Sequence, residues 1–335
     1  MRRVLFISKS RAAASTRYRA LQLLPLLEER GWAAEQRVAP KTMAGRAAML
    51  RAASRAGVVV VLRRTFTPPM RLALRRAARR LVFDFDDAIY TTADGPSRSR
   101  CRRFAAMLNR CDQVWAGNQT LAEAAREHQS NVTVHPTCLD PAPYLADAPA
   151  SCRTWEAEPH GPGVTLVWIG SSSTRPYLES IFTPLAEAAG RVGRLRLRVV
   201  ADFAPPQQPP LEIQPVTWSR EIEAAALRSS DIGVAPLPKD PWTRGKCGFK
   251  VLQYMAAGLP VIASPVGVNA DLVTDGETGL HAASDAQWID AVTQLASDKA
   301  KREAMGAAGQ RAMLQRYTID HAADRAAASL DALCG

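Results

Sequence analysis

Two lysines, a glutamine and several glycines lie close together between residues 244 and 267, and this combination could bind a phosphate group. The stretch Arg244-Gly-Lys246-Cys-Gly248 combines cations with glycines that let the backbone approach a ligand closely. A helix predicted from Phe249 would point free N–H groups and a partial positive charge at the same place. Lys250 would lie in the first turn of that helix, where the dipole disfavours a cation unless an anion is bound. We therefore expect a phosphate site.

Gln253 lies three residues after Lys250, on the same helical face, where an amide could reach a sugar hydroxyl. The helix should end at Gly258, and 259–263 should form a short buried parallel strand. The following loop, which ends at Gly267, would lie at the carboxyl end of that strand, where open α/β sheets bind ligands. The alternative interpretation is an ordinary strand–helix turn with a solvated lysine.

Three carboxylates, Asp84, Asp86 and Asp87, follow one another at the carboxyl end of another predicted strand. Carboxylates this close together need partners, and functional groups often lie at such strand ends. One interpretation is a metal site, since an Asp-x-Asp pair can chelate a divalent ion that bridges phosphates. The other is structural, with helix capping and an ion pair to Arg64 or Arg17.

A second phosphate loop is predicted after the strand 165–169. Gly170 and the hydroxyl residues that begin at Ser171 would leave backbone amides free to face a phosphate, and Arg175 could clamp it. The elements that position these loops alternate between buried apolar runs and helical patterns. This alternation predicts doubly wound parallel sheets.

The chain has 335 residues, 47% of them hydrophobic, which is enough for two domains with large cores. Its net charge of +11 would suit an anionic partner. Nucleic acid is disfavoured because the arginines are scattered, with little aromatic interleaving and no recognisable motif. A basic segment fits peripheral contact with an anionic membrane better. Its arginines are Arg71, Arg75, Arg76, Arg79 and Arg80.

The six cysteines do not have the spacing of a metal site, and we recognise neither a leader-like segment nor an apolar segment long enough to span a membrane. We therefore expect a cytoplasmic protein. Any membrane contact should be peripheral, at the inner face.

The string from Gly245 to Lys250, followed by Gln253-Tyr-Met-Ala-Ala-Gly-Leu-Pro-Val-Ile262, resembles the donor-binding segment of the GT-B glycosyltransferases, in particular the retaining family 4 group. The resemblance implies that the lysines bind the diphosphate of a nucleotide-sugar. A glutamate usually holds the ribose at the position of Gln253, so we expect a Gln253→Glu variant to be tolerated. The string around Asp84 and the segments 116–122 and 135–144 also resemble this group.

The resemblance implies two Rossmann-like doubly wound domains facing each other across a cleft, with the C-terminal helix crossing back to the N-domain. We place an acceptor-binding domain at 1–150, a linker at 151–163, a donor-binding domain at 164–316 and the returning helix at 317–335. The expected catalytic residues are Lys250, Lys246, Asp86 and Asp87. The expected donor-binding residues are Gly170, Ser171, Arg175, Arg244, Lys246, Lys250, Gln253 and Gly267. The resemblance places Arg11, Ser15, Arg17 and Arg19 on the acceptor side.

We therefore predict a glycosyltransferase that moves a sugar from a nucleotide-sugar to a glycan, a lipid-linked glycan or a metabolite, with retention and without a metal or other cofactor. Bacterial polysaccharide synthesis is the typical setting of this group. Two alternatives remain open: a metal-dependent GT-A-type transferase that uses Asp84 and Asp86, and a GT-B-like nucleotide-sugar-binding protein without turnover.

Overall fold

The computed structural model describes residues 2–145 and 163–335. Its contacts divide the chain into two compact units. Unit 1 comprises Met1–Asp140, Asp240–Cys247 and Tyr317–Gly335, and unit 2 comprises Pro141–Lys239 and Gly248–Arg316. The predicted linker, 151–163, lies almost entirely outside the described residues, and the predicted domain boundaries stay a prediction.

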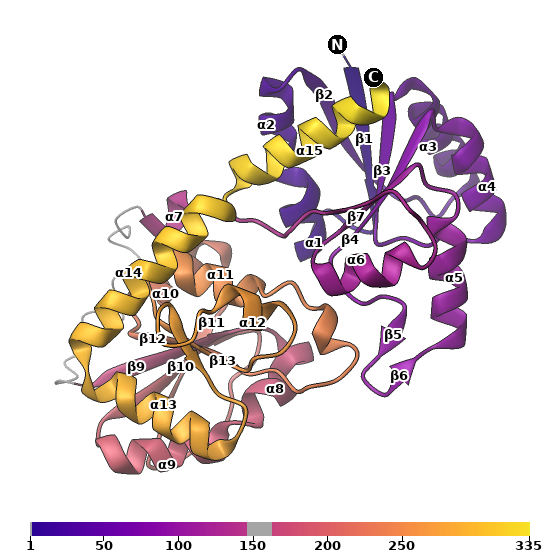
Figure 1. Cartoon of the computed structure of the whole chain (residues 1–335). Helices are drawn as coiled ribbons and strands as arrows, with labels where there is room; N and C mark the ends of the chain where they lie inside the picture. The colour runs from indigo at the N-terminus through magenta and orange to yellow at the C-terminus, as the bar shows by residue number, and fades with distance from the viewer. Residues whose placement is uncertain (1, 146–162) are drawn as a thin grey trace. The chain divides into compact units, whose positions relative to one another are not determined.

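Unit 1 is built around a six-stranded parallel sheet with the strand order β2-β1-β3-β4-β7-β8 (Figure 1). Its strands are β1 (Arg2–Ser8), β2 (Trp32–Val38), β3 (Val58–Leu62), β4 (Arg80–Phe85), β7 (Gln113–Ala116) and β8 (Val132–Val134), with a small hairpin of β5 (Thr91–Thr92) and β6 (Gly95–Pro96). Its helices are α1 (Ala14–Thr16), a π-helical turn (Arg17–Leu21), α2 (Leu24–Glu29), α3 (Met43–Arg55), α4 (Pro68–Ala77), α5 (Arg98–Leu108), α6 (Gln119–Arg126), a 3₁₀ turn (Thr243–Gly245) and α15 (Ile319–Cys334).

The strands form where β-branched and aromatic residues are buried on both faces of the sheet. β3 is Val-Val-Val-Val-Leu and is buried throughout, as expected for a central parallel strand. In β4 the side chains alternate, so that Phe83 and Phe85 join one core cluster and Val82 joins the other. Asp84 lies on the same side of the strand as Val82. The second cluster also receives α15, which lies along β1 and β3 (Figure 1).

The spacing of apolar residues predicts one helix over 15–29, after the first strand, and the structure differs from it. The helix is interrupted by the π-helical turn Arg17–Leu21 and by Gln22–Leu23 before α2 begins. Pro25 lies at the start of α2, where it needs no backbone N–H. The structure also contains β2 and α3, neither of which the sequence patterns predicted.

Unit 2 has the same architecture, with the parallel strand order β11-β10-β9-β12-β13-β14. Its strands are β9 (Val164–Ile169), β10 (Leu195–Ala201), β11 (Glu212–Thr217), β12 (Ile232–Ala235), β13 (Val261–Ala263) and β14 (Gly279–His281). Its helices are α7 (Ala142–Leu145), a 3₁₀ turn (Ser172–Thr174), α8 (Arg175–Glu179), α9 (Phe182–Val192), α10 (Arg220–Arg228), α11 (Phe249–Ala256), α12 (Val268–Leu272), α13 (Asp285–Ser297) and α14 (Lys299–Arg316).

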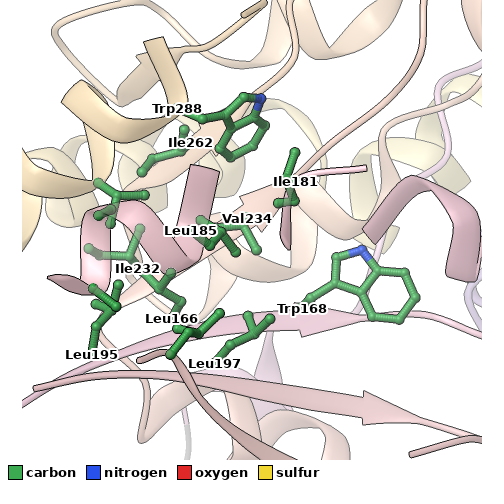
Figure 2. Close-up of a cluster of buried hydrophobic side chains, with 14 of the residues drawn as sticks. Leu166, Trp168, Ile181, Leu185, Leu195, Leu197, Ile232, Val234, Ile262 and Trp288 are labelled. Atoms are coloured by element: carbon green, nitrogen blue, oxygen red, sulfur yellow. The ribbon is translucent and has the colours of Figure 1, made fainter. Parts of the chain in front are cut away.

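The core of unit 2 lies between the sheet and the helices α9 and α13. Figure 2 shows Leu166, Ile232 and Ile262 from three neighbouring strands together with Leu185 of α9 and Trp288 of α13. Burying these side chains supplies about 1.5 to 3 kcal/mol each. The core therefore fixes the strands whose ends carry the predicted phosphate loops.

Each sheet reverses its strand order once. In unit 1 the chain runs from β1 to β2 on one side and then to β3 on the other. In unit 2 it runs from β9 to β10 and β11 on one side and then to β12 on the other. Ligands of open α/β sheets bind outside the carboxyl ends of the strands at such a reversal. Arg63 directly follows β3, and Gly170 directly follows β9, so both lie at these points.

Candidate functional site

The loop after β9 is organised by its own side chains. Ser171 and Thr174 form a capping box, and the Ser172 N–H donates to Asp202 Oδ1 at 2.7 Å. A carboxylate therefore occupies a place where an anion was predicted. Arg175, predicted to clamp a phosphate, pairs with Glu179 at 2.6 Å.

Gly170 has a packing role that the sequence did not reveal. A Cβ atom at this position would lie 2.1 Å from the ring of Trp168, far inside any real contact. Trp168 is buried, and the ammonium of Lys250 lies 5.3 Å from the centroid of its ring. The indole therefore lies beneath the glycine and within cation–π distance of the lysine.

Lys250 lies in the first turn of α11, as predicted. Gly248, the residue before the helix, has φ +62°, and a Cβ there would lie 2.5 Å from Leu272 Cδ1. Glycine is required here because the backbone is left-handed and the space is filled. The residue before α11 is a glycine and has no side chain with which to cap the helix, and the first turn, with Lys250, lies at the carboxyl end of the unit 2 sheet.

Gln253 is only 3% exposed, and its amide Nε2 donates to Tyr144 Oη at 3.1 Å. Tyr144 donates in turn to Glu223 Oε1 at 2.8 Å, and Glu223 Oε2 accepts from Trp218 Nε1 at 2.8 Å. The predicted ribose ligand is therefore part of a buried network. Sequence reasoning missed its other members, because they are far from Gln253 in the chain and belong to no local pattern.

In unit 1, Arg19 binds Asp84 through two guanidinium nitrogens, with Nε 2.7 Å from Oδ2. Arg19 also donates to His135 O at 2.8 Å and to Thr137 Oγ1 at 3.2 Å. Both charged side chains are buried. The structure thus places Arg19, predicted on the acceptor side, within the interior of unit 1, where it neutralises Asp84.

The other two carboxylates meet Arg63 and Lys246. Arg63 Nη2 lies 2.6 Å from Asp87 Oδ2, and Arg63 Nη1 lies 3.3 Å from Asp86 Oδ1. Lys246 Nζ lies 3.0 Å from Asp87 Oδ1. The ion-pair partners of these aspartates are thus Arg63 and Lys246, and not the predicted Arg64 or Arg17. The signal for Arg63 was its place directly after a buried strand.

Arg63 has φ +55°, a left-handed conformation that is unfavourable for a residue with a side chain. Such strain costs on the order of 1 to 3 kcal/mol and is concentrated at functional sites. Burial raises the pKa of the Asp86 carboxyl, although Arg63 and Arg19 oppose the shift. This edge of unit 1 is therefore a strained and partly desolvated group of charges.

The segment 240–247 is held on unit 1 by specific bonds. Asn118 Nδ2 donates to Lys246 O at 3.0 Å, and Cys247 Sγ donates to Asp86 O at 3.0 Å. A Cβ at Gly117 would lie 2.5 Å from Cys247 Sγ, so the glycine allows this close approach. The ammonium of Lys246 also lies 4.8 Å from the centroid of the Trp242 ring.

The remaining predicted residues lie at loop or helix positions. Arg11 and Arg244 are exposed and Ser15 is partly exposed, while Arg17 lies over the ring of Tyr18 with its guanidinium carbon 4.5 Å from the centroid. Gly267 precedes α12 with φ +54°.

In the basic segment Arg71 is buried and donates to Thr65 O and Phe66 O, and Arg75 pairs with Asp112, so the five arginines do not form one free face.

Within the described ranges, no three His, Cys, Asp or Glu side chains are grouped so that they could hold a metal ion. The same part of the chain contains no helix long and apolar enough to cross a membrane.

The whole chain is similar to proteins whose structures have been solved. The HepE protein of Anabaena, crystallised with UDP, matches with a TM-score of 0.72 at 16% identity, covering 99% of this chain and all of that one. Sucrose-phosphate synthase of Thermosynechococcus elongatus matches with a TM-score of 0.75 at 15% identity over 99% of both chains. This likeness defines the class: the chain has the two-domain α/β GT-B fold, as predicted. The GT-A fold of the first alternative is therefore wrong, and whether a metal is needed stays a prediction.

Residues 155–298 match the family described as "Glycosyl transferases group 1". A D-inositol 3-phosphate glycosyltransferase of Corynebacterium aurimucosum is 32% identical over 127 residues, which is 37% of this chain and 24% of that protein. A protein of the same name from Pseudarthrobacter chlorophenolicus is 33% identical over 138 residues, which is 40% of this chain and 30% of that protein.

The chain thus matches less than a third of the length of these curated relatives. Its segment 155–298 is similar to the group 1 glycosyltransferases, and the predicted resemblance to the GT-B glycosyltransferases is confirmed. Retention and the family 4 assignment stay predictions.

Proposed function

We propose that this protein transfers a sugar from a nucleotide-sugar donor to an acceptor. The observation that carries the proposal is the group 1 glycosyltransferase match over 155–298, which contains both the loop at Gly170 and the helix α11 with Lys250. In the proposal the diphosphate binds at the start of α11. There the helix N–H groups and Lys250 stabilise the negative charge that grows as the leaving nucleotide departs.

We also propose roles for individual residues around the donor and the acceptor. Gly170, Ser171, Arg175, Arg244 and Gly267 line the donor, and a phosphate that takes the Ser172 N–H must displace Asp202. Lys246 acts on the phosphates only after leaving Asp87. Asp86 and Asp87 contact a donor or acceptor sugar, and the loop residues Arg11, Ser15 and Arg17 contact the acceptor. Transfer proceeds with retention, and the leaving phosphate accepts the proton of the acceptor.

The test begins with a thermal-shift screen of UDP, GDP, dTDP and ADP, because a nucleotide that binds the folded state raises its melting temperature. The selected nucleotide defines a panel of sugar donors, which are incubated with glycan, lipid-linked and small-molecule acceptors. We expect release of the nucleoside diphosphate together with a glycosylated product of retained anomeric configuration. Nucleotide binding without release across the panel would favour a binding protein without turnover.

We further propose that unit 1 contacts anionic lipid headgroups through the exposed Arg76, Arg79 and Arg80. Each cation near such a surface contributes on the order of 1 kcal/mol, and salt screens the attraction. Association with phosphatidylserine vesicles should therefore weaken steeply from low to moderate salt. Equal binding to neutral phosphatidylcholine vesicles would contradict the proposal.

A further inference from the structure

In the hydrogen-bond network that links Trp218, Glu223, Tyr144 and Gln253, the donor and the acceptor of each bond are fixed by the chemistry of the side chains. An indole N–H can only donate, so Glu223 Oε2 is the acceptor for Trp218 Nε1 at 2.8 Å. A glutamate carboxylate only accepts, so the Tyr144 hydroxyl must give its hydrogen to Glu223 Oε1 at 2.8 Å. The tyrosine oxygen then has lone pairs left, and its neighbour at position 253 must be a donor.

Glutamine satisfies this requirement, and glutamate does not. The amide of Gln253 donates through Nε2 to Tyr144 Oη at 3.1 Å. A carboxylate at 253 would have no hydrogen to donate. It would also place a second negative charge next to the Tyr144 hydroxyl, which already contacts the carboxylate of Glu223. Gln253, Tyr144 and Glu223 are 3%, 6% and 5% exposed, so water cannot easily repair the mismatch.

The same bonds orient the amide of Gln253. With Nε2 committed to Tyr144, the amide oxygen Oε1 is held as the remaining acceptor of the side chain. Within the described part of the chain, Oε1 accepts no hydrogen bond and is not among the fully buried polar atoms without a partner, so it keeps some exposed surface. It is therefore available to a hydroxyl group.

We propose that Tyr144 and Glu223 are positioning residues that hold Gln253 so that Oε1 accepts a hydrogen bond from a ribose hydroxyl, and that Glu223 dictates an amide at 253. This inference rests on the proposed nucleotide-sugar function. It replaces the expectation that Gln253→Glu is tolerated, because the carboxylate at 223 now makes that variant unfavourable.

The two residues can be exchanged to test the coupling. In the double variant Gln253→Glu with Glu223→Gln, the amide at 223 accepts from Trp218 and donates to Tyr144, which then donates to the carboxylate at 253. The bond from Trp218 keeps its direction, and the two bonds of Tyr144 are restored in the reverse direction. Gln253→Glu alone leaves the Tyr144 contact without a hydrogen, so the double variant should recover what this single variant loses. Glu223→Gln alone can keep its bonds if the Gln253 amide turns, so that Oε1 accepts from Tyr144 and Nε2 replaces Oε1 toward the ligand.

The experiment measures the melting temperature of each variant and its dissociation constant for the nucleotide that the screen selects from UDP, GDP, dTDP and ADP. The dissociation constant for the 2′,3′-dideoxy analogue of that nucleotide is measured in parallel. We expect Gln253→Glu to lower the melting temperature by several degrees and to weaken nucleotide binding about tenfold. The exchanged pair should restore both to within about threefold of the original affinity. Tyr144→Phe should reduce the preference for the ribonucleotide over its dideoxy analogue.

Glu212→Gln is the matched control, since it removes a carboxylate of unit 2 that is exposed and paired with Arg196, and it should change neither quantity. If no nucleotide binds the original protein, the proposed function fails, while the melting temperatures still test the network. Gln253→Glu with unchanged stability and affinity, or an exchanged pair no better than Gln253→Glu alone, would overturn the inference.

Discussion

The two units share a parallel-sheet architecture, but different kinds of side chain lie at the carboxyl ends of their sheets. In unit 1 the edge is a group of charges that satisfy one another: Arg19 with Asp84, and Arg63 and Lys246 with Asp87. In unit 2 the edge joins the start of α11 and Lys250 to Gly170, the indole of Trp168 and a buried network in which the amide of Gln253 donates to Tyr144. The topology thus determines where a site can form. The side chains determine whether the charges there are already paired within the protein or can attract an anion.

The charged edge of unit 1 should be the most sensitive to mutation. Arg19→Met leaves the buried Asp84 without a counter-charge and should cost about 3 to 5 kcal/mol of unfolding free energy. Urea unfolding monitored by circular dichroism measures this loss. Arg37→Met, which removes an exposed ion pair with Glu35, should cost at most about 1 kcal/mol.

Combining Arg19→Met with Asp84→Leu should restore much of the lost stability, because the buried charge is then gone. If Arg19→Met were no more harmful than Arg37→Met, the description of unit 1 as held by buried charges would be wrong.

In unit 2 the largest effect should appear in catalysis. Lys250→Ala removes a cation that acts most strongly as the leaving diphosphate gains charge, so kcat/KM should fall about a hundredfold, or about 3 kcal/mol, with little loss of stability. Steady-state kinetics with the identified donor measure this. Lys239→Ala, at an exposed position of the same unit, should leave the kinetics unchanged. Near-normal turnover of Lys250→Ala would refute the phosphate assignment.

Gly170→Ala tests whether the first loop of unit 2 is set by packing. The added methyl would clash with the Trp168 ring, so the melting temperature should fall by the equivalent of about 1 to 3 kcal/mol even without nucleotide. Adding Trp168→Phe should relieve part of that loss. A variant that melts normally and loses only donor affinity would show that the glycine serves the ligand alone.

The dependence of stability on pH should come partly from His135 in unit 1. Burial, with Arg19 and Arg325 nearby, lowers the pKa of His135 to about 3 from an ordinary value of 6.5. Between these values the unfolded chain binds the extra proton, so stability is full above pH 6.5 and falls as the pH decreases through this window. The slope should approach about 1.4 kcal/mol per pH unit.

His135→Phe, which keeps a ring to stack on Trp115, should remove that contribution when urea midpoints are compared from pH 7 to pH 5. An unchanged slope in this variant would mean that other groups carry the pH dependence.

The smallest effect is expected from chelation. Because lysines and a helix end meet the phosphates in the proposal, activity should be the same with and without EDTA. Loss of activity with EDTA and rescue by manganese would show that the carboxylates of unit 1 take part through a metal. The charges of unit 1 would then bind a ligand and would not merely pair with one another.

The sequence alone was enough for the repeated strands and helices and for the placement of Lys250. The hydrophobic pattern predicts strands at 58–62 and 113–116 and helices at 285–297 and 299–316, and these are the bounds of β3, β7, α13 and α14. These features depend on the hydrophobic pattern of adjacent residues, which is local information. The strand β2 escaped prediction because Trp-Ala-Ala-Glu-Gln-Arg-Val lacks a continuous apolar run.

Only the tertiary structure decided the partners of the functional side chains. Arg19 and Asp84 are 65 positions apart, Tyr144 and Gln253 are 109 apart, and Asp87 and Lys246 are 159 apart. No local pattern relates such residues, because folding alone brings them together. The fold therefore determined that Arg63 and not Arg64 pairs with the aspartates, and that Gln253 donates to a buried tyrosine.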